Sequence, residues 1–480
     1  MSDAIRSLEP HALWNCFADL NAVPRPSKQE TRVKAFVKEF AAKHSLECIE
    51  DRGGNLIVKK PASADRVGRP PIILQAHLDM VHKAADGMSF DFMNQGIEMW
   101  VDGDWVRARG TTLGADNGLG VAAILAVLAS KGLKHPPLEA LLTIDEEQGM
   151  SGARLLQGGL LTGKTMLNLD SEEDDEFTIG CAGGIDTLVS WSYPEIAHEK
   201  ASIFEIRVEG LRGGHSGLQI QEGRGNAIKL MARILAACGE KVVALIDMRG
   251  GSARNAIPAR CIARVAVFNQ LVFTQTIAEQ VQAIWNEFKR LEPDLQITTK
   301  DLDNGPVATL IPEKQSALML ALQAVVNGVY RMSPEVPGLV EASSSLSLID
   351  LGRGHAEWSG LQRSSVESSK RDVSAAFAAP FRLLGAEVHN DDGYPGWSPS
   401  ASSVILDQMQ GIYRELFGHD VGVSACHAGL ECGVIAQTYP GLDMISFGPD
   451  IEEAHSENER ASISSAQKFW KLLITTLARL

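Results

Sequence analysis

Residues 118–130 read GLGVAAILAVLAS, and residues 138–145 read LEALLTID. The first segment is apolar on all sides and predicts a buried helix, whereas the second predicts a buried strand. Further apolar strands are predicted before them in PIILQAHLDMV, at residues 71–81, and after them in TMLNLD, at residues 165–170. Because strands alternate with helices here, we expect an α/β domain in which helices are layered on a sheet.

The sequence pattern changes after residue 186 and returns near residue 393. Between these points, alternating strands such as FEIRVEGL at residues 204–211 and apolar helices are typical of an α+β region. We therefore expect a discontinuous α/β domain over residues 1–186 and 393–480, with a mixed sheet flanked by helices. An inserted α+β domain would span residues 187–392, with a repeated pattern that is compatible with two α+β halves.

The charge balance argues against polyanionic partners. The 480 residues include 60 acidic and 45 basic side chains, giving a formal net charge of −15. Such a field repels nucleic acids and anionic membrane surfaces. No apolar run reaches the roughly 18 residues of a membrane span, and the N-terminal residues lack a signal-peptide pattern. Seven cysteines without a C-x-x-C pair suit a reducing compartment, so we expect a cytoplasmic protein.

Histidine and acidic side chains follow several predicted strands. His77 and Asp79 lie two residues apart at the end of an apolar strand, so both side chains point to one face. A carboxylate beside an imidazole can fix its tautomer and strengthen it as a metal ligand. An isolated pair of this kind is more often a structural hydrogen bond. Further candidates stand at predicted strand ends or in loops, namely Asp116, Glu146, Glu147, Asp170 and His455.

These candidates are far apart in sequence, but the carboxyl ends of strands in an α/β sheet share one edge. Residues that follow different strands can therefore meet in one crevice. Two histidines with several carboxylates suit two divalent, zinc-like ions, because one carboxylate can bridge the ions while others bind each of them.

An ordered set of motifs along the whole chain resembles the M20 metallopeptidases. Within this family it is similar to the aminoacyl-histidine dipeptidases, the peptidase D group of cytosolic nonspecific dipeptidases. Any single motif is weak evidence, but the ordered set is specific. The matching motifs are QAHLDMV, RGTTLGADNG, EE-x-GM-x-GA, LDSEE, GCAGGID, GGHSG, RNAIP, YPGW, HAGLECG and HSENER.

The resemblance implies a zinc-peptidase domain with two Zn²⁺ per subunit, for which Mn²⁺ or Co²⁺ could substitute. His77 and Asp170 would bind one ion. Glu147 and His455 would bind the other, and Asp116 would bridge the two.

Two further acids would serve the chemistry directly. The resemblance implies that Asp79 orients His77 and that Glu146 is the general base that takes a proton from the attacking water. Without the resemblance, an exposed loop acid is an equally good interpretation of Glu146. The family pattern also suggests a cis peptide bond between Asp116 and Asn117.

The inserted domain would serve as a lid or dimerisation domain and supplies candidates for substrate binding. The resemblance implies that His215 in GGHSG stabilises the tetrahedral oxyanion. Asn255 in RNAIP could hold the substrate backbone, and Arg363 in LQRSS could bind a free carboxylate. His427 and Glu431 are kept as pocket candidates outside the metal site. A homodimer through the inserted domain would leave open whether His215 serves its own site or its partner's.

The sequence therefore predicts a metal-dependent hydrolase of unblocked dipeptides, including Xaa-His dipeptides such as carnosine. A related N-acyl amino acid deacylase or tripeptide aminopeptidase would share the same metal core and is the nearest alternative. A non-catalytic metal-binding protein is a remote alternative, because every expected ligand and Glu146 are present.

Overall fold

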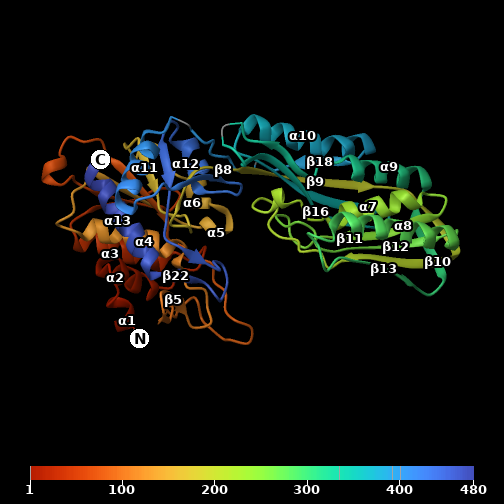
Figure 1. Cartoon of the computed structure of the whole chain (residues 1–480), viewed down its shortest axis with the longest axis horizontal. Coiled ribbons are helices and arrows are strands. Elements are labelled where there is room, and N and C mark those ends of the chain that lie inside the picture. The colour runs from red at the N-terminus through yellow and green to blue at the C-terminus, as the bar shows by residue number, and fades with distance from the viewer. Residues whose placement is uncertain (1, 335, 392, 401) are drawn as a thin grey trace. The chain divides into compact units, whose positions relative to one another are not determined.

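The computed structural model describes residues 2–334, 336–391, 393–400 and 402–480. The chain forms two compact units, which can be followed by colour in Figure 1. Unit 1 comprises Met1–Gly180, Pro399–Ala425 and Glu431–Leu480. Unit 2 comprises Cys181–Ser398 and the short segment Cys426–Leu430. These junctions differ by a few residues from positions 186 and 393, and the sequence pattern did not indicate that Cys426–Leu430 joins unit 2.

Unit 1 is built on a mixed sheet. Its middle strands β6, β3, β7 and β20 run parallel to one another, whereas β1 pairs antiparallel with β2, β2 with β6, and β20 with β8. Parallel strands require buried faces, which agrees with the apolar runs of the sequence. Within the described residues the strand order is β1 (Glu47–Glu50), β2 (Leu56–Lys60), β6 (Leu138–Thr143), β3 (Ile72–His77), β7 (Thr165–Asn168), β20 (Asp443–Ser446), β8 (Glu176–Cys181) and β19 (Gly422–Cys426).

The apolar helix expected over residues 118–130 is α4 (Ala115–Ala129). It is buried along almost its whole length, and it packs against β3 and against α2 (His11–Asn21). An all-apolar helix is stable only when enclosed in this way. The other helices of unit 1 are α1 (Ser2–Arg6), α3 (Thr31–Lys43), α5 (Glu146–Gly149), α6 (Ser151–Arg154), α11 (Val404–Phe417), α12 (Glu431–Thr438), α13 (Ile463–Arg479) and the 3₁₀ turn η1 (Ala64–Arg66).

A smaller antiparallel sheet in unit 1 connects the C-terminal region to the segment before α4. Strand β22 pairs with β5, so the chain just after residue 459 lies beside the chain just before residue 109. In order, its strands are β21 (Ile451–Glu452), β22 (Arg460–Ser462), β5 (Trp105–Ala108) and β4 (Met99–Asp102). This pairing brings two distant sequence motifs to one place.

Unit 2 has an antiparallel sheet with a layer of helices on it. Helix α9 contacts both α7 and α10, and all three helices contact the sheet, so they form a single layer. Its described strands follow the order β13 (Gln296–Asp301), β10 (Glu195–Glu209), β12 (Cys261–Val267), β11 (Val243–Gly250), β16 (Val340–Gly352), β17 (His355–Ser364), β9 (Gly183–Ser192) and β18 (Glu387–Asn390), while β14 (Gly305–Leu310) pairs with β10 and β15 (Gly328–Met332) with β16. Its helices are α7 (Ala227–Cys238), α8 (Gln270–Phe288), α9 (Pro312–Ala324), α10 (Glu367–Leu384) and the 3₁₀ turn η2 (Ile220–Glu222).

The α/β class and the mixed sheet flanked by helices are as expected from the sequence. Each unit has its own core of buried apolar side chains. In unit 1 the core lies between the mixed sheet and its helices, and in unit 2 between the antiparallel sheet and the helix layer. Among the described residues, no helix is long and apolar enough to cross a membrane.

Candidate metal and active site

Three parallel strands of unit 1 end at the same edge of the sheet. Strand β3 ends at His77, β6 at Thr143 and β7 at Asn168. In a parallel sheet this edge collects the side chains that follow each strand. The short turn after β6 leads to Glu146 and Glu147, and the turn after β7 leads to Asp170.

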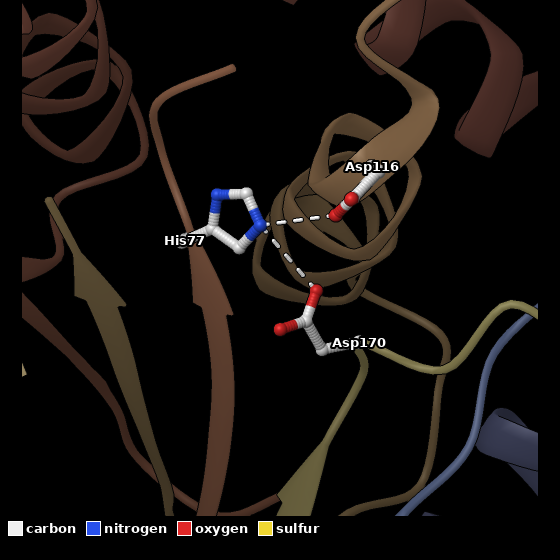
Figure 2. Close-up of side chains that lie close together, drawn as sticks. All are labelled: His77, Asp116 and Asp170. Carbon is white, nitrogen blue, oxygen red and sulfur yellow. Dashed lines mark hydrogen bonds and ion pairs between the residues drawn. The ribbon is translucent and has the colours of Figure 1, made fainter. Parts of the chain in front are cut away.

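His77 is almost fully buried, and one nitrogen of its ring faces two carboxylates (Figure 2). Its Nε2 atom is 3.0 Å from Oδ1 of Asp116 and 3.5 Å from Oδ1 of Asp170. Burial by itself lowers the pKa of His77, but Asp170 and the hydrogen bond with Asp116 raise it well above its usual value. An imidazole nitrogen and two carboxylate oxygens around one point form a suitable donor set for a divalent cation.

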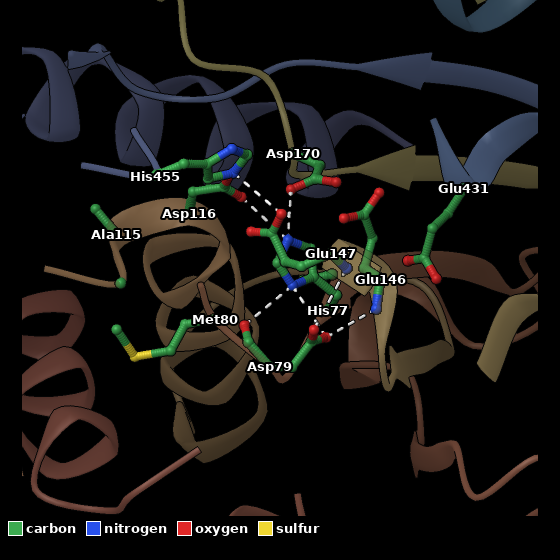
Figure 3. A network of polar contacts seen from close by, with 12 residues as sticks. His77, Asp79, Met80, Ala115, Asp116, Glu146, Glu147, Asp170, Glu431 and His455 are labelled. Atoms are coloured by element: carbon green, nitrogen blue, oxygen red, sulfur yellow. Dashed lines mark hydrogen bonds and ion pairs between the residues drawn. The ribbon is translucent and has the colours of Figure 1, made fainter. Parts of the chain in front are cut away.

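His455 forms the second half of the arrangement. Its Nε2 atom lies 3.0 Å from Oδ2 of Asp116 and 3.0 Å from Oε2 of Glu147. Hydrogen bonds with these two carboxylates raise the pKa of His455 to about 11. Asp116 thus contacts one histidine with each of its carboxylate oxygens, and Figure 3 shows it between them.

The backbone is unusual at two of these positions. His455 has a φ of 62°, in the left-handed region that residues other than glycine rarely adopt. The peptide bond between Asp116 and Asn117 is cis, as the family resemblance suggests.

Asp79 links the histidine to the acidic turn. Its Oδ1 atom is 3.4 Å from Nδ1 of His77, and its backbone oxygen lies 3.1 Å from the same nitrogen. The backbone N–H groups of Glu146 and Glu147 donate to the Asp79 carboxylate at 3.0 and 3.4 Å. Burial alone would raise the pKa of Asp79, but the hydrogen bond from His77 lowers it. An ionised Asp79 therefore holds both the imidazole and the turn that follows β6.

The residues present fit divalent cations. Ligand atoms lie within 4.8 Å of one another in three groups among the described residues. One carboxylate oxygen of Glu147, Oε1, is buried and has no hydrogen-bond partner. A buried carboxylate oxygen without a partner is suited to binding a cation. The groups are His77 with Asp116 and Asp170, His77 with Glu146 and Glu147, and Asp116 with Glu147 and His455.

Burial and hydrogen bonds shift the pKa values of the carboxylates at this site in different directions. Burial would raise the pKa of Asp116, yet hydrogen bonds from His455 and His77 hold it well below its usual range. Burial raises the pKa of Glu146 well above its usual value, and nearby Glu147 adds to this effect. Burial also raises the pKa of Glu147 and of Asp170, so a raised pKa suits Glu146 to accepting and returning a proton but does not by itself set it apart from these two acids.

A buried polar network adjoins this site. Glu431 is fully buried and accepts hydrogen bonds from Gln75 Nε2 at 2.7 Å and from Thr143 Oγ1 at 2.5 Å. Asn168 donates in turn to the side chain of Gln75. Burial raises the pKa of Glu431 to about 7. Glu431 belongs to none of the three ligand groups, and its carboxylate links the neighbouring strands β3 and β6.

The substrate-binding candidates of the inserted region lie in unit 2. Backbone N–H groups of Gly217 and Leu218 donate to Nδ1 of His215 at 3.2 and 3.1 Å, so the remaining imidazole proton is on Nε2. Nη2 of Arg363 lies 3.4 Å from this Nε2 atom. Burial, followed by the charge of Arg363, lowers the pKa of His215 to about 4, so the ring is neutral.

Arg363 is 3% exposed, and its Nη1 donates to the hydroxyl of Tyr394 at 2.6 Å. Asn255 lies near His215 through its backbone, because its carbonyl accepts a hydrogen bond from Ser216 N–H at 2.8 Å. The side chain of Asn255 is exposed. Nearby in unit 2, Nε2 of His427 is 2.8 Å from the hydroxyl of Ser343.

Two buried charged residues at the metal site were missed by the sequence analysis. Glu459 lies within the HSENER motif, four residues after His455, but no role was assigned to it. Arg25 lies in none of the motifs that the sequence analysis identifies. Only the position of Glu459 in that motif offered a signal.

The sequence matches peptidase family M20/M25/M40 over residues 73–479. This match spans most of the chain, so the protein belongs to peptidase family M20 and is a hydrolase that acts on peptide bonds. It is 38% identical over 477 residues to the cytosol non-specific dipeptidase of Escherichia coli (strain K12), covering 98% of each chain. The predicted family is confirmed.

Solved structures agree with this assignment. The crystal structure of aminoacylhistidine dipeptidase from Vibrio alginolyticus superimposes with a TM-score of 0.92 at 37% identity, covering 100% of this chain and 99% of that one. A tripeptidase from Staphylococcus aureus superimposes with a TM-score of 0.54 at 16% identity, covering 98% of each chain, which shows a shared fold alone.

Proposed function

We propose that this protein is a metal-dependent dipeptidase that hydrolyses unblocked dipeptides, including Xaa-His dipeptides such as carnosine. The observation that carries the proposal is the position of Asp116, whose two carboxylate oxygens each lie 3.0 Å from a histidine nitrogen, of His77 and His455. Each histidine has a further carboxylate beside it, so one shared acid joins two ligand groups. Similarity to a dipeptidase over the full chain supports the substrate class.

The two ligand groups would hold Zn²⁺, with Mn²⁺ or Co²⁺ able to substitute. His77, Asp116 and Asp170 would hold one ion, and a second group would hold the other. When bound, such ions supply Lewis-acid polarisation of the scissile carbonyl and lower the pKa of water. The second group consists of Asp116, Glu147 and His455.

Glu146 would act as the general base and then as the general acid. Its raised pKa allows it to take a proton from the attacking water and to return that proton to the leaving amine. Asp79 would position the reacting groups, since it contacts His77 and holds the backbone of Glu146.

Residues 187–392 would form a substrate-binding domain that also mediates a homodimer. In it, Nε2–H of His215 and Nη2–H of Arg363 are neighbouring donors, 3.4 Å apart. Two adjacent donors are satisfied together by an anion. We assign this position to the oxyanion or the free carboxylate of a dipeptide, with the Asn255 amide on the substrate backbone. The cytosolic location of the Escherichia coli relative supports a cytosolic site of action.

A substrate panel tests the proposal. Zinc-loaded protein is assayed with several dipeptides, β-alanyl-histidine, a tripeptide and N-acetylated amino acids, each with and without chelator. We expect chelator-sensitive cleavage of the unblocked dipeptides alone, restored by adding Zn²⁺. Chelator-insensitive cleavage would contradict the metal site.

The same panel separates the related activities. Cleavage of the acetylated amino acids in place of dipeptides would make the protein a deacylase, and preferred release of an amino acid from the tripeptide would make it a tripeptidase. The homodimer is tested separately by sedimentation velocity, in which a single species at the monomer mass would contradict it.

A further inference from the structure

The loop before Asp116 directs its backbone N–H groups at one buried carboxylate. Leu113 and Gly114 donate to Oε2 of Glu459 at 2.7 and 2.9 Å. Ala115 and Asp116 donate to Oε1 of the same side chain at 2.7 and 3.3 Å. Glu459 is only 3% exposed. Four converging N–H groups at the start of a long helix favour a negative charge at this point.

A buried cation holds the same loop from its carbonyl side. Arg25 is 1% exposed, and its Nη2 donates to the carbonyl of Gly114 at 2.5 Å. Its Nη1 donates to the carbonyls of Leu78 and Asp79 at 3.2 Å each. Arg25 therefore ties the loop before Asp116 to the segment that directly follows β3.

The peptide group between Gly114 and Ala115 lies between these two charges. Its C=O accepts from Arg25, and its N–H donates to Glu459. A peptide dipole held between a cation and an anion away from water has one strongly preferred orientation. The next residue along the chain is Asp116.

The local sequence allows this close approach. Gly114 has a φ of 69°, and a Cβ atom there would lie 2.6 Å from Nη2 of Arg25. Glu459 also follows His455 by four residues, so one short segment carries both a histidine of the site and the acid that holds the Asp116 loop. A displacement of Glu459 would affect both sides of Asp116.

We propose that Glu459 and Arg25 are positioning residues that set the orientation of the Asp116 carboxylate between His77 and His455. The inference rests on the proposed function, because it assigns the shared acid to two metal ions. Neutralising Glu459 leaves four loop N–H groups competing for one neutral acceptor. The peptide groups of the loop then change orientation, and Asp116 loses its position between the histidines. The affinity for metal ions falls, whereas the residues proposed to bind substrate are unchanged.

The test compares Glu459→Gln with a matched control, Glu457→Gln, in the full chain. Glu457 lies in the same motif but is partly exposed and pairs with Lys83 at 3.2 Å. Binding of Co²⁺ is followed by its visible absorption spectrum and by equilibrium dialysis, and kcat and KM are measured for one dipeptide. For Glu459→Gln we expect a changed spectrum, about tenfold or greater weakening of Co²⁺ affinity and a similar fall in kcat, with KM nearly unchanged. The control should match the wild type.

If Glu459→Gln has the Co²⁺ spectrum and Co²⁺ affinity of the wild type and only its unfolding temperature is lower, the inference is overturned. Glu459 would then be a structural residue. Arg25→Lys provides a second variant if Glu459→Gln does not fold. Arg25→Lys keeps the positive charge but loses the planar pair of N–H donors. We therefore expect the same changes in the Co²⁺ spectrum, Co²⁺ affinity and kcat. Wild-type metal binding in Arg25→Lys would also overturn the inference. Failure of the wild type itself to bind Co²⁺ would overturn the proposed function and the inference with it.

Discussion

The backbone N–H of Glu146 donates to Oδ1 of Asp79 at 3.0 Å. Asp79 also contacts Nδ1 of His77 at 3.4 Å, so one buried carboxylate holds a histidine of the ligand groups and the backbone of the proposed base. The turn after β6 and the end of β3 are thereby locked to each other. In the proposed mechanism, Asp79 would affect both metal binding and proton transfer without receiving the transferred proton itself.

Asp79→Asn should fold but lose most activity. The asparagine keeps one oxygen for the Glu146 N–H, yet it lacks the negative charge that lies beside His77. We expect kcat to fall by about 10-fold to 100-fold with a smaller change in KM. Steady-state kinetics check this, with circular dichroism to verify folding. Unchanged kcat in a folded, metal-loaded variant would contradict the role of Asp79.

Glu146→Gln should retain both metal ions and lose most turnover, by about 10²-fold or more, because the amide cannot accept the proton of the attacking water. Metal content is measured by atomic absorption alongside kcat. The exposed Glu39→Gln on α3 serves as the control and should behave as the wild type. Normal turnover in Glu146→Gln would remove Glu146 from the role of general base.

Arg363→Ala should weaken recognition of a free carboxylate. The buried guanidinium lies beside two neutral groups, the hydroxyl of Tyr394 and the imidazole of His215, so an anion is the favourable partner for its charge. KM should rise by about tenfold or more for dipeptides and much less for dipeptide amides. Arg371→Ala, exposed on α10, is the matched control. Equal effects on both substrate types would exclude the carboxylate role.

His427 should make stability depend on pH. Burial, and then the charges of Arg363 and His215, lower its pKa to about 3, whereas an unfolded chain has a histidine pKa of about 6.5. The neutral, buried His427 side chain contributes fully to the stability of the folded state above about pH 6.5. This contribution is lost as pH falls toward 3, because only the unfolded state binds the proton in that interval.

The measurement for His427 is urea unfolding at pH 6.5, 5.5 and 4.5, comparing the wild type with His427→Gln. As pH falls, the free energy of unfolding should decline less steeply in His427→Gln than in the wild type, by up to about 1.4 kcal/mol per pH unit. Parallel declines in the two proteins would show that His427 is protonated in the folded state.

Much of unit 1 could be predicted from local patterns. The apolar run at residues 118–130 could be stable only inside the protein, and it is the buried helix α4. The strand ending at His77 was expected from its apolar run, and period-two geometry already implied a shared face for His77 and Asp79. The strand order of unit 2 was not predictable, because long-range pairing in an antiparallel sheet leaves no local signal.

The residue types at the site were present in the motifs, and family resemblance suggested their grouping. The contacts themselves required the tertiary structure. His455 lies 339 residues from Asp116, and only strand pairing and packing bring them within 3.0 Å. The same holds for Glu459 and Arg25, which meet the two sides of one peptide group in a loop far from both in sequence. Residue chemistry is a local property of the chain, whereas the alignment of buried charges with a backbone dipole arises only when distant segments pack together.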